Sequence, residues 1–132
     1  MKLPKCAPVP AAARYRRKAV RSLRYDGKDL SSEIQGEGFA FACVVFRDPL
    51  GFRLLDERDL CEFWSDYNER NGWLYEVEEG GWLELESQRA LFNSPSLFPE
   101  LKEYLLVDDK CISVLAIAAP EIEDRGAAPP SA

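Results

Sequence analysis

Residues 39–46 read FAFACVVF, an unbroken apolar run that is rich in aromatic and β-branched side chains. Because both alternating faces of such a run are apolar, it predicts a strand in the interior of a sheet. A second run of the same kind, CISVLAIA, spans 111–118 and is followed by Pro120. We therefore expect two buried strands at the centre of the fold.

Shorter strands are predicted on both sides of the first run. VRSLRY at 20–25 alternates apolar and polar residues and ends at Asp26-Gly27, a turn dipeptide. LSSEIQ at 30–35 is its expected partner. The residues DPLG at 48–51 predict a turn, which makes FRLL at 52–55 a short return strand.

The segment 57–70 predicts an amphipathic helix. Asp56 suits the N-cap position, and Asn71-Gly72 provides a left-handed stop. The apolar stripe consists of Leu60, Phe63, Trp64 and Tyr67. Four acids, Asp59, Glu62, Asp66 and Glu69, have the spacing that puts them together on the opposite face.

The stretch WLYEVEEGGWLELE at 73–86 predicts a β-hairpin that turns at 79–81. This loop keeps the apolar side chains of both strands on one face, which fixes the register. The face expected in the core holds Trp73, Tyr75, Val77, Leu83 and Leu85. The face expected in solvent holds Leu74, Glu76, Glu78, Trp82, Glu84 and Glu86. The pattern therefore predicts an exposed tryptophan among glutamates.

A second helix is predicted over 96–106, where Pro99 falls in the first turn and leucines recur at helical spacing. Together these elements predict a single α+β domain over 14–123, with a mostly antiparallel sheet and two helices. The Pro- and Ala-rich residues 1–13 are expected to form a disordered leader, and 124–132 a disordered tail.

The residue types argue against catalysis. The chain has no histidine, which is the commonest general base, and no glycine-rich phosphate loop or nucleophile-elbow motif. A carboxylate pair could act as acid and base, but the sequence does not single out one pair among 23 acidic residues. We therefore expect no enzyme, no catalytic residue and no cofactor.

Metal, disulfide and membrane features are not expected either. The four cysteines, Cys6, Cys43, Cys61 and Cys111, are widely spaced, and a metal site would need thiolates and carboxylates alone. Cys43 and Cys111 lie in apolar runs and are expected to be buried. Reduced thiols are typical of a cytoplasmic protein, and no apolar run reaches the ~20 residues of a membrane helix.

Charge is distributed unevenly along the chain. Residues 1–24 carry eight basic residues and no acid, whereas the remainder carries 9 basic and 23 acidic residues. We expect the acids of 57–70 and 73–86 to form one acidic surface that attracts basic proteins and repels nucleic acid. A weaker alternative is that the basic start, with Tyr15, contacts phosphates.

In overall character, a small acidic α+β domain without a catalytic set, the chain resembles the immunity proteins of bacterial polymorphic toxin systems. The resemblance covers this general profile and no aligned motif, so it assigns no residue. It implies a partner that is a basic toxin domain, often a nuclease, whose active site the immunity protein blocks.

The resulting hypothesis is a protein-binding module that uses an acidic, tryptophan-bearing surface to bind and inhibit a basic protein. Its predicted partner-binding residues are Trp82, Glu76, Glu78, Glu84, Glu86, Asp59, Glu62, Asp66 and Glu69. The alternative is a small-molecule-binding or enzymatic domain with a pocket lined by aromatics such as Trp64 and Trp73. An apolar pocket with converging polar groups would favour this alternative, and a flat acidic surface would favour protein binding.

Overall fold

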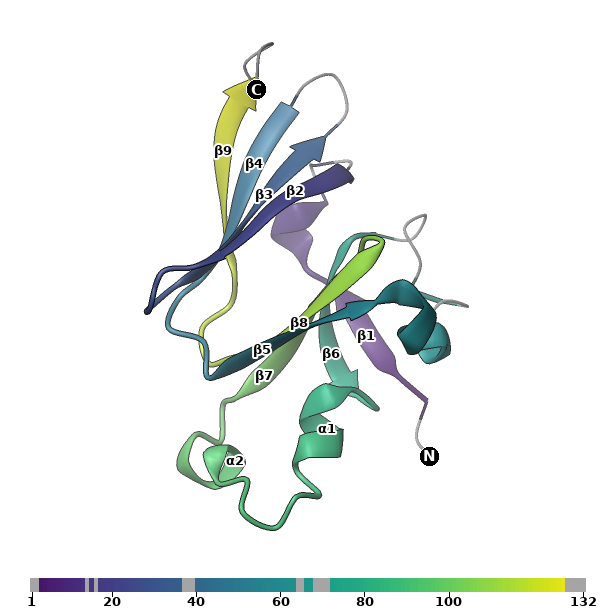
Figure 1. Cartoon of the computed structure of the whole chain (residues 1–132), viewed down its shortest axis with the longest axis vertical. Coiled ribbons are helices and arrows are strands. Elements are labelled where there is room, and N and C mark those ends of the chain that lie inside the picture. Colours follow the sequence, from purple (N-terminus) through teal and green to yellow (C-terminus); the bar gives the residue numbers. More distant parts are fainter. Residues whose placement is uncertain are drawn as a thin grey trace.

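In the computed structural model, two antiparallel sheets pack face to face (Figure 1). The structure describes residues 3–13, 15, 17–36, 40–63, 66–67 and 72–127. The five-stranded sheet has the order β1 (Lys5–Pro8), β6 (Leu74–Glu79), β7 (Lys102–Leu106), β8 (Lys110–Ala116) and β5 (Gly51–Asp56). The four-stranded sheet has the order β2 (Arg17–Tyr25), β3 (Leu30–Gly36), β4 (Ala40–Phe46) and β9 (Glu121–Ala127). The helical elements are η1 (Pro10–Ala12), η3 (Glu57–Phe63), α1 (Trp82–Glu86) and α2 (Ser94–Leu97).

The two interior strands predicted from hydrophobicity are confirmed over 40–46 and 111–116, whereas residue 39 lies outside the described part of the chain and residues 117–118 are exposed beyond the end of β8. β4 lies between β3 and β9, and β8 lies between β7 and β5. The shorter strands expected at 20–25, 30–35 and 52–55 fall within β2, β3 and β5. The turn expected at Asp26-Gly27 is also present, because Gly27 has a φ of 96° and Asp26 Oδ1 accepts hydrogen bonds from the backbone N–H groups of Lys28 and Asp29.

The inner faces of the two sheets share one hydrophobic core. Phe46 of β4 and Ile112 of β8 are at most 2% exposed, and the ring of Phe46 lies 6.0 Å from that of Tyr104 in β7. Trp73 is also in this core, and its Nε1–H donates a 2.9 Å hydrogen bond to the carbonyl of Tyr15. That bond joins the segment after η1 to the start of β6.

The outer face of the five-stranded sheet is covered by η3 and α1. Leu60 and Phe63 of η3 pack in a second cluster with Tyr75 and Leu105. This arrangement contradicts the predicted α-helix over 57–70, since residues 57–63 form a 3₁₀-helix with a kink at Leu60, where φ is −127°. Residues 64–65 and 68–71 lie outside the described part of the chain.

The predicted hairpin at 73–86 is wrong in its second strand. Residues 74–79 form β6, but Trp82–Glu86 form the helix α1. β6 is paired on one side with β1 and on the other with β7, so neither edge is available to a strand at 82–86. The predicted face assignment is confirmed for Trp73, Tyr75 and Val77, which are buried, but it is wrong for Leu74, which is 1% exposed, and for Leu85, which is 60% exposed.

The predicted helix at 96–106 is wrong as well. Residues 94–97 form the single turn α2, and 102–106 form the strand β7. β7 lies in the middle of the five-stranded sheet with both faces covered, so Tyr104, Leu105 and Leu106 are all buried. A strand buried on both faces has consecutive apolar residues, which also fit helical spacing.

The fold is therefore dominated by antiparallel sheet, with only short helical segments among the described residues. The ends of the chain differ from the expectation of a disordered leader and tail. Lys5–Pro8 pair with β6 as β1, and β9 continues to Ala127. The folded unit thus extends beyond both limits of the predicted 14–123, while 128–132 are outside the described residues. No helix in the described ranges has the length and hydrophobicity that crossing a membrane requires.

Candidate functional site

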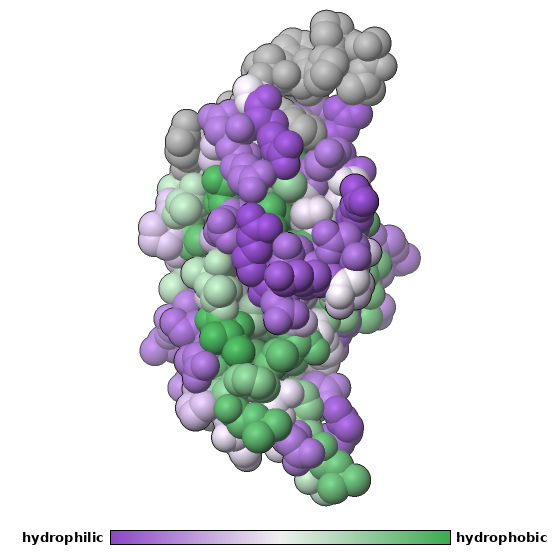
Figure 2. All heavy atoms as spheres, turned by 90° about the vertical axis from the view of Figure 1, so that its left-hand side faces the viewer, coloured by the Kyte–Doolittle hydropathy of each residue, from purple (hydrophilic) through white to green (hydrophobic). Residues whose placement is uncertain are grey.

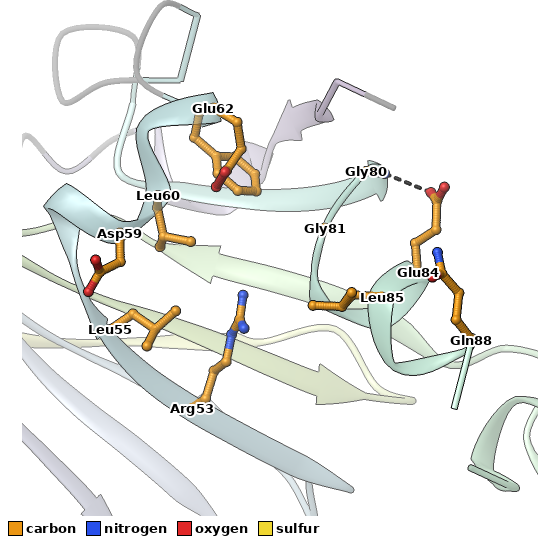
Figure 3. A pocket seen from close by; sticks show the side chains of 11 residues that line it. Arg53, Leu55, Asp59, Leu60, Glu62, Gly80, Gly81, Glu84, Leu85 and Gln88 are labelled. Atoms are coloured by element: carbon orange, nitrogen blue, oxygen red, sulfur yellow. Dashed lines mark hydrogen bonds between the residues drawn. The ribbon is translucent and has the colours of Figure 1, made fainter. Parts of the chain in front are cut away.

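A cavity of about 510 Å³ opens between η3 and α1 on the outer face of β5 (Figure 3). Its volume lies in the range of about 300–1,000 Å³ that is typical of ligand sites. The polar lining residues are Arg53, Asp59, Glu62, Glu84 and Gln88. The apolar lining residues are Leu55, Leu60, Phe63 and Leu85, and Gly80 and Gly81 complete the wall.

Three predicted partner-binding acids lie together around this cavity. Asp59 and Glu62 come from η3, and Glu84 comes from α1 on the other side. Asp59 and Glu62 are exposed, whereas Glu84 is partly buried and its Oε2 accepts a 2.7 Å hydrogen bond from the backbone N–H of Gly80. The cavity entrance therefore carries negative charge from two separate elements.

The position of α1 depends on a tight turn at Gly80 and Gly81. Gly80 has a φ of 74°, a conformation that glycine adopts without steric penalty. At Gly81, the N-cap of α1, an added Cβ would lie 2.6 Å from Glu103 Oε1 and 2.7 Å from Val77 Cγ1. The lack of a side chain at Gly81 thus allows α1 to rest directly on β6 and β7.

Glu103 of β7 supplies the cap that the helix itself lacks. Its Oε1 accepts a 2.8 Å hydrogen bond from the backbone N–H of Leu83, one of the free donors of the first turn of α1. Glu103 is only 1% exposed, and burial raises the pKa of its carboxyl group. The hydrogen bond from Leu83 and the charge of Arg53 act in the opposite direction on the pKa.

Arg53 projects from β5 into the cavity (Figure 3). The guanidinium carbon lies 5.2 Å from the centre of the Trp82 ring, so the two side chains form a cation–π contact. Burial lowers the pKa of Arg53, and the nearby charges of Glu103, Glu62 and Glu86 oppose that shift. Arg53 is therefore a cation held in a partly desolvated position among acids.

Trp82 is not the exposed anchor that the hairpin register predicted. It is partly buried, and its ring lies over β5, because a Cβ on Gly51 would be 3.6 Å from Trp82 Cη2. Its Nε1–H donates a 3.2 Å hydrogen bond to Glu86 Oε1. Glu86 in turn pairs with Arg89 at 2.9 Å, which lowers the pKa of Glu86. The Trp82 ring thus contacts Arg53, and the hydrogen bond between Trp82 and Glu86 links two residues one turn apart in α1.

The remaining predicted partner-binding acids do not join the cavity. Glu76 forms an ion pair with Lys102 at 3.4 Å, and Glu78 forms one with Lys5 at 3.7 Å. Asp66 is exposed but does not line the cavity, and Glu69 lies outside the described residues. Of the nine predicted partner-binding residues, the structure thus gathers Asp59, Glu62 and Glu84 around one cavity.

The aromatic pocket of the alternative hypothesis is not formed by Trp73. This residue is 5% exposed and belongs to the core between the sheets, and Trp64 lies outside the described part of the chain. Cys43 and Cys111 are buried as predicted, at 5% and 0% exposed. Burial raises the pKa of the Cys6 thiol to about 12, so this thiol is protonated at neutral pH. Within the described ranges, no three metal-binding side chains lie together in a way that could hold an ion.

The sequence patterns missed Arg53 and Glu103. Arg53 stands in the short segment FRLL as one polar residue of an alternating strand, which gives no sign of a cavity. Glu103 was expected on a helix, where an acid at this position would face solvent. Its burial follows only once 102–106 is known to be a strand, because Glu103 and Leu105 then point to the same side of the sheet.

Comparison with known proteins adds no identification: the chain matches no family model, and neither curated proteins nor solved structures show a significant match. The cavity must therefore be interpreted from its own residues.

Proposed function

We propose that this protein is a protein-binding module that receives a basic segment of a partner protein in the cavity between η3 and α1. The observation that carries the proposal is the convergence of Asp59, Glu62 and Glu84, from two elements, on one cavity with leucine walls. Lysine and arginine side chains suit such a site, because their aliphatic stems pack on apolar surface while their charged ends remain near acids. Inhibition of a toxin domain is the form of this function that the resemblance to immunity proteins implies.

Charge supports the same partner chemistry. The chain carries a net charge of −6, and three acids of the segment 56–86 line the cavity. Such a field speeds the encounter with a basic partner and disfavours acidic ones. The alternative of a small-molecule site keeps two arguments, namely the concave shape and volume of the cavity and its apolar walls with converging polar groups.

The second surface feature of the molecule does not lead to a function. Hydrophobic residues gather toward the end of the molecule where α2 lies, below a mostly hydrophilic region (Figure 2). Leu91 and Leu97, which flank and belong to α2, are 80% and 69% exposed. Nothing in the described structure indicates what would cover them.

A synthetic peptide of alternating lysine and leucine, blocked at both ends so that it has no carboxylate, tests the proposal. We expect saturable binding by calorimetry that weakens as salt rises, since exposed charges are screened over about 8 Å at physiological ionic strength. The double variant Asp59→Asn, Glu62→Gln should bind about five- to thirtyfold more weakly, because two charge contacts of roughly 0.5–1 kcal/mol each are removed.

The double variant Glu33→Gln, Glu100→Gln is the matched control, because it changes the net charge equally at exposed positions that do not line the cavity. It should retain most of the affinity. Equal losses in both double variants would mean that net charge alone attracts the peptide, and the cavity would then not be its binding site. The absence of any saturable binding would also refute the proposal.

A further inference from the structure

Arg53 has hydrogen-bonding capacity that the described structure does not use. It pairs through the backbone with Ser113 of β8, and its side chain points into the cavity (Figure 3). The Nε atom is buried and has no hydrogen-bond partner. Within the described part of the chain the guanidinium forms no ion pair, although Glu103, Glu62 and Glu86 are near enough to influence it.

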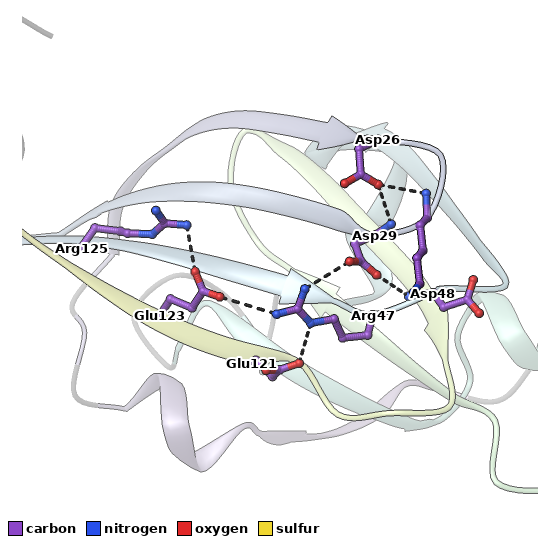
Figure 4. Close-up of polar contacts among 8 residues, drawn as sticks. Asp26, Asp29, Arg47, Asp48, Glu121, Glu123 and Arg125 are labelled. Carbon is purple, nitrogen blue, oxygen red and sulfur yellow. Dashed lines mark hydrogen bonds and ion pairs between the residues drawn. The ribbon is translucent and has the colours of Figure 1, made fainter.

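Arg47 shows how this fold uses an arginine for structure (Figure 4). Its guanidinium pairs with Glu121 at 2.8 Å, with Asp29 at 3.1 Å and with Glu123 at 3.7 Å. These contacts join the turn before β3, the end of β4 and the strand β9. Arg47 is thus fully engaged by its own chain, in contrast to Arg53.

The setting of Arg53 fixes its position without satisfying its donors. Trp82 contacts the guanidinium through its ring, and a ring accepts no conventional hydrogen bond from the guanidinium edge. The buried Nε is out of reach of a ligand, but the terminal nitrogens of the guanidinium are not among the buried atoms and form no hydrogen bond within the described residues, so they are the donors that a ligand in the cavity can reach. The guanidinium edge matches planar groups with two acceptor oxygens.

We propose that Arg53 binds a carboxylate that lies among the basic side chains of the partner segment. This inference rests on the proposed function and adds a second requirement to it. The acids Asp59, Glu62 and Glu84 would hold the flanking cations, while Arg53 takes the carboxylate between them. The ligand chemistry is therefore zwitterionic, with one anion at the cavity floor and cations at its entrance.

A carboxylate fits this cavity better than a phosphate group does. Three acids line the cavity, and Glu86 and Glu103 lie close to Arg53, so the local field disfavours negative charge apart from the single contact with the arginine. A phosphate monoester carries a charge of about −1.5 to −2 at neutral pH, which increases the repulsion relative to a carboxylate. A carboxylate brings one charge and two oxygens in the plane of the guanidinium.

The test uses four peptides derived from the blocked lysine–leucine peptide. One has a central glutamate, the second a central glutamine, the third a free C-terminal carboxylate and the fourth a central phosphoserine. We expect the glutamate peptide, or the peptide with the free end, to bind the unsubstituted protein roughly tenfold more tightly than the glutamine peptide. Which of the two gains affinity shows whether a side chain or a chain end supplies the carboxylate.

Substitution of Arg53 assigns the effect to this residue. In Arg53→Gln the ratio of the affinities for the carboxylate peptide and the glutamine peptide should fall to about one. In Arg53→Lys this ratio should be reduced, because lysine keeps the charge but loses the planar fork. Arg24→Gln, at an exposed position on β2, is the charge-matched control and should keep the full preference. Thermal melting of each variant confirms that it is folded.

The outcomes separate the two proposals. If all peptides bind with equal affinity, Arg53 is not a carboxylate site, while the cavity remains a site for basic segments. If no peptide binds, both proposals fail. Tighter binding of the phosphoserine peptide than of the carboxylate peptides would overturn the choice of ligand. If the Arg53→Gln variant still prefers the carboxylate peptide over the glutamine peptide, the carboxylate binds at a residue other than Arg53.

Discussion

Replacing Gly81 with alanine should lower the free energy of unfolding by about 3 kcal/mol, because the added methyl group has no space and disturbs the cap of α1. The new Cβ would lie 2.6 Å from Glu103 Oε1 and 2.7 Å from Val77 Cγ1. Both neighbours are buried, so neither can turn into solvent. The melting temperature should fall by roughly 10 °C, as expected for a chain of this size.

Gly51→Ala provides the matched control for this substitution. Its Cβ would lie 3.6 Å from Trp82 Cη2, an ordinary contact, and Gly51 is in the regular strand β5. The free energy of unfolding of Gly51→Ala should differ from that of the unsubstituted protein by no more than about 1 kcal/mol. Equal stability of the Gly81→Ala variant and the unsubstituted protein would show that α1 does not rest on β6 and β7 as described.

Replacing Glu103 with leucine should cost about 3 kcal/mol of unfolding free energy at neutral pH. The substitution removes the acceptor for the backbone N–H of Leu83, and it leaves Arg53 without the nearby negative charge of Glu103. Denaturant unfolding measures the difference. Glu103→Gln keeps one acceptor oxygen in place, so it should be less destabilising than leucine. A leucine variant that is as stable as the glutamine variant would argue against the cap.

The pH dependence of Glu103→Gln should reveal the burial of the carboxyl group. Burial raises the pKa of Glu103 above its ordinary value of 4.5. Between the two values the folded state binds more protons than the unfolded state, so the contribution of Glu103 to stability falls as the pH rises. Glutamine does not titrate, and the stability of Glu103→Gln relative to the unsubstituted protein should therefore increase from pH 4 to pH 7. A constant difference would indicate an ordinary pKa.

The interior strands could be predicted because their burial on both faces is visible in one short segment. The runs at 39–46 and 111–118 have no polar face, and β4 and β8 lie between partners in their sheets. The segment 102–106 is buried in the same way, but its flanking residues Leu97 and Leu101 extend a helical spacing. The hydrophobic pattern alone does not distinguish a helix from a fully buried strand in such a case.

The prediction of a second hairpin strand was wrong because segments that are distant in the sequence pair with β6. The residues WLELE at 82–86 alternate as a strand would, but β1 pairs with one edge of β6 and β7 pairs with the other. The N-terminal residues that form β1 look like a disordered leader because of their prolines. Local patterns therefore carried no information about which segment would pair with β6.

Only the acidic character of the candidate site could be predicted from the sequence. Asp59, Glu62 and Glu84 were expected on one acidic surface, and the structure places all three around one cavity. Arg53 and Glu103 belong to strands on either side of β8, and their proximity depends on the pairing of three strands. No spacing within one segment could indicate that arrangement.

The most direct test of the account is to map where a basic ligand binds. The ¹⁵N-labelled protein is titrated with the blocked lysine–leucine peptide that has a central glutamate, and amide chemical shifts are followed by NMR. We predict saturable shifts that are largest at residues on the two sides of the cavity, namely Leu55, Leu60, Gly80 and Leu85. Largest shifts on β3 or β9 of the other sheet, or no saturable shift at any amide, would contradict the assignment of the cavity as the binding site.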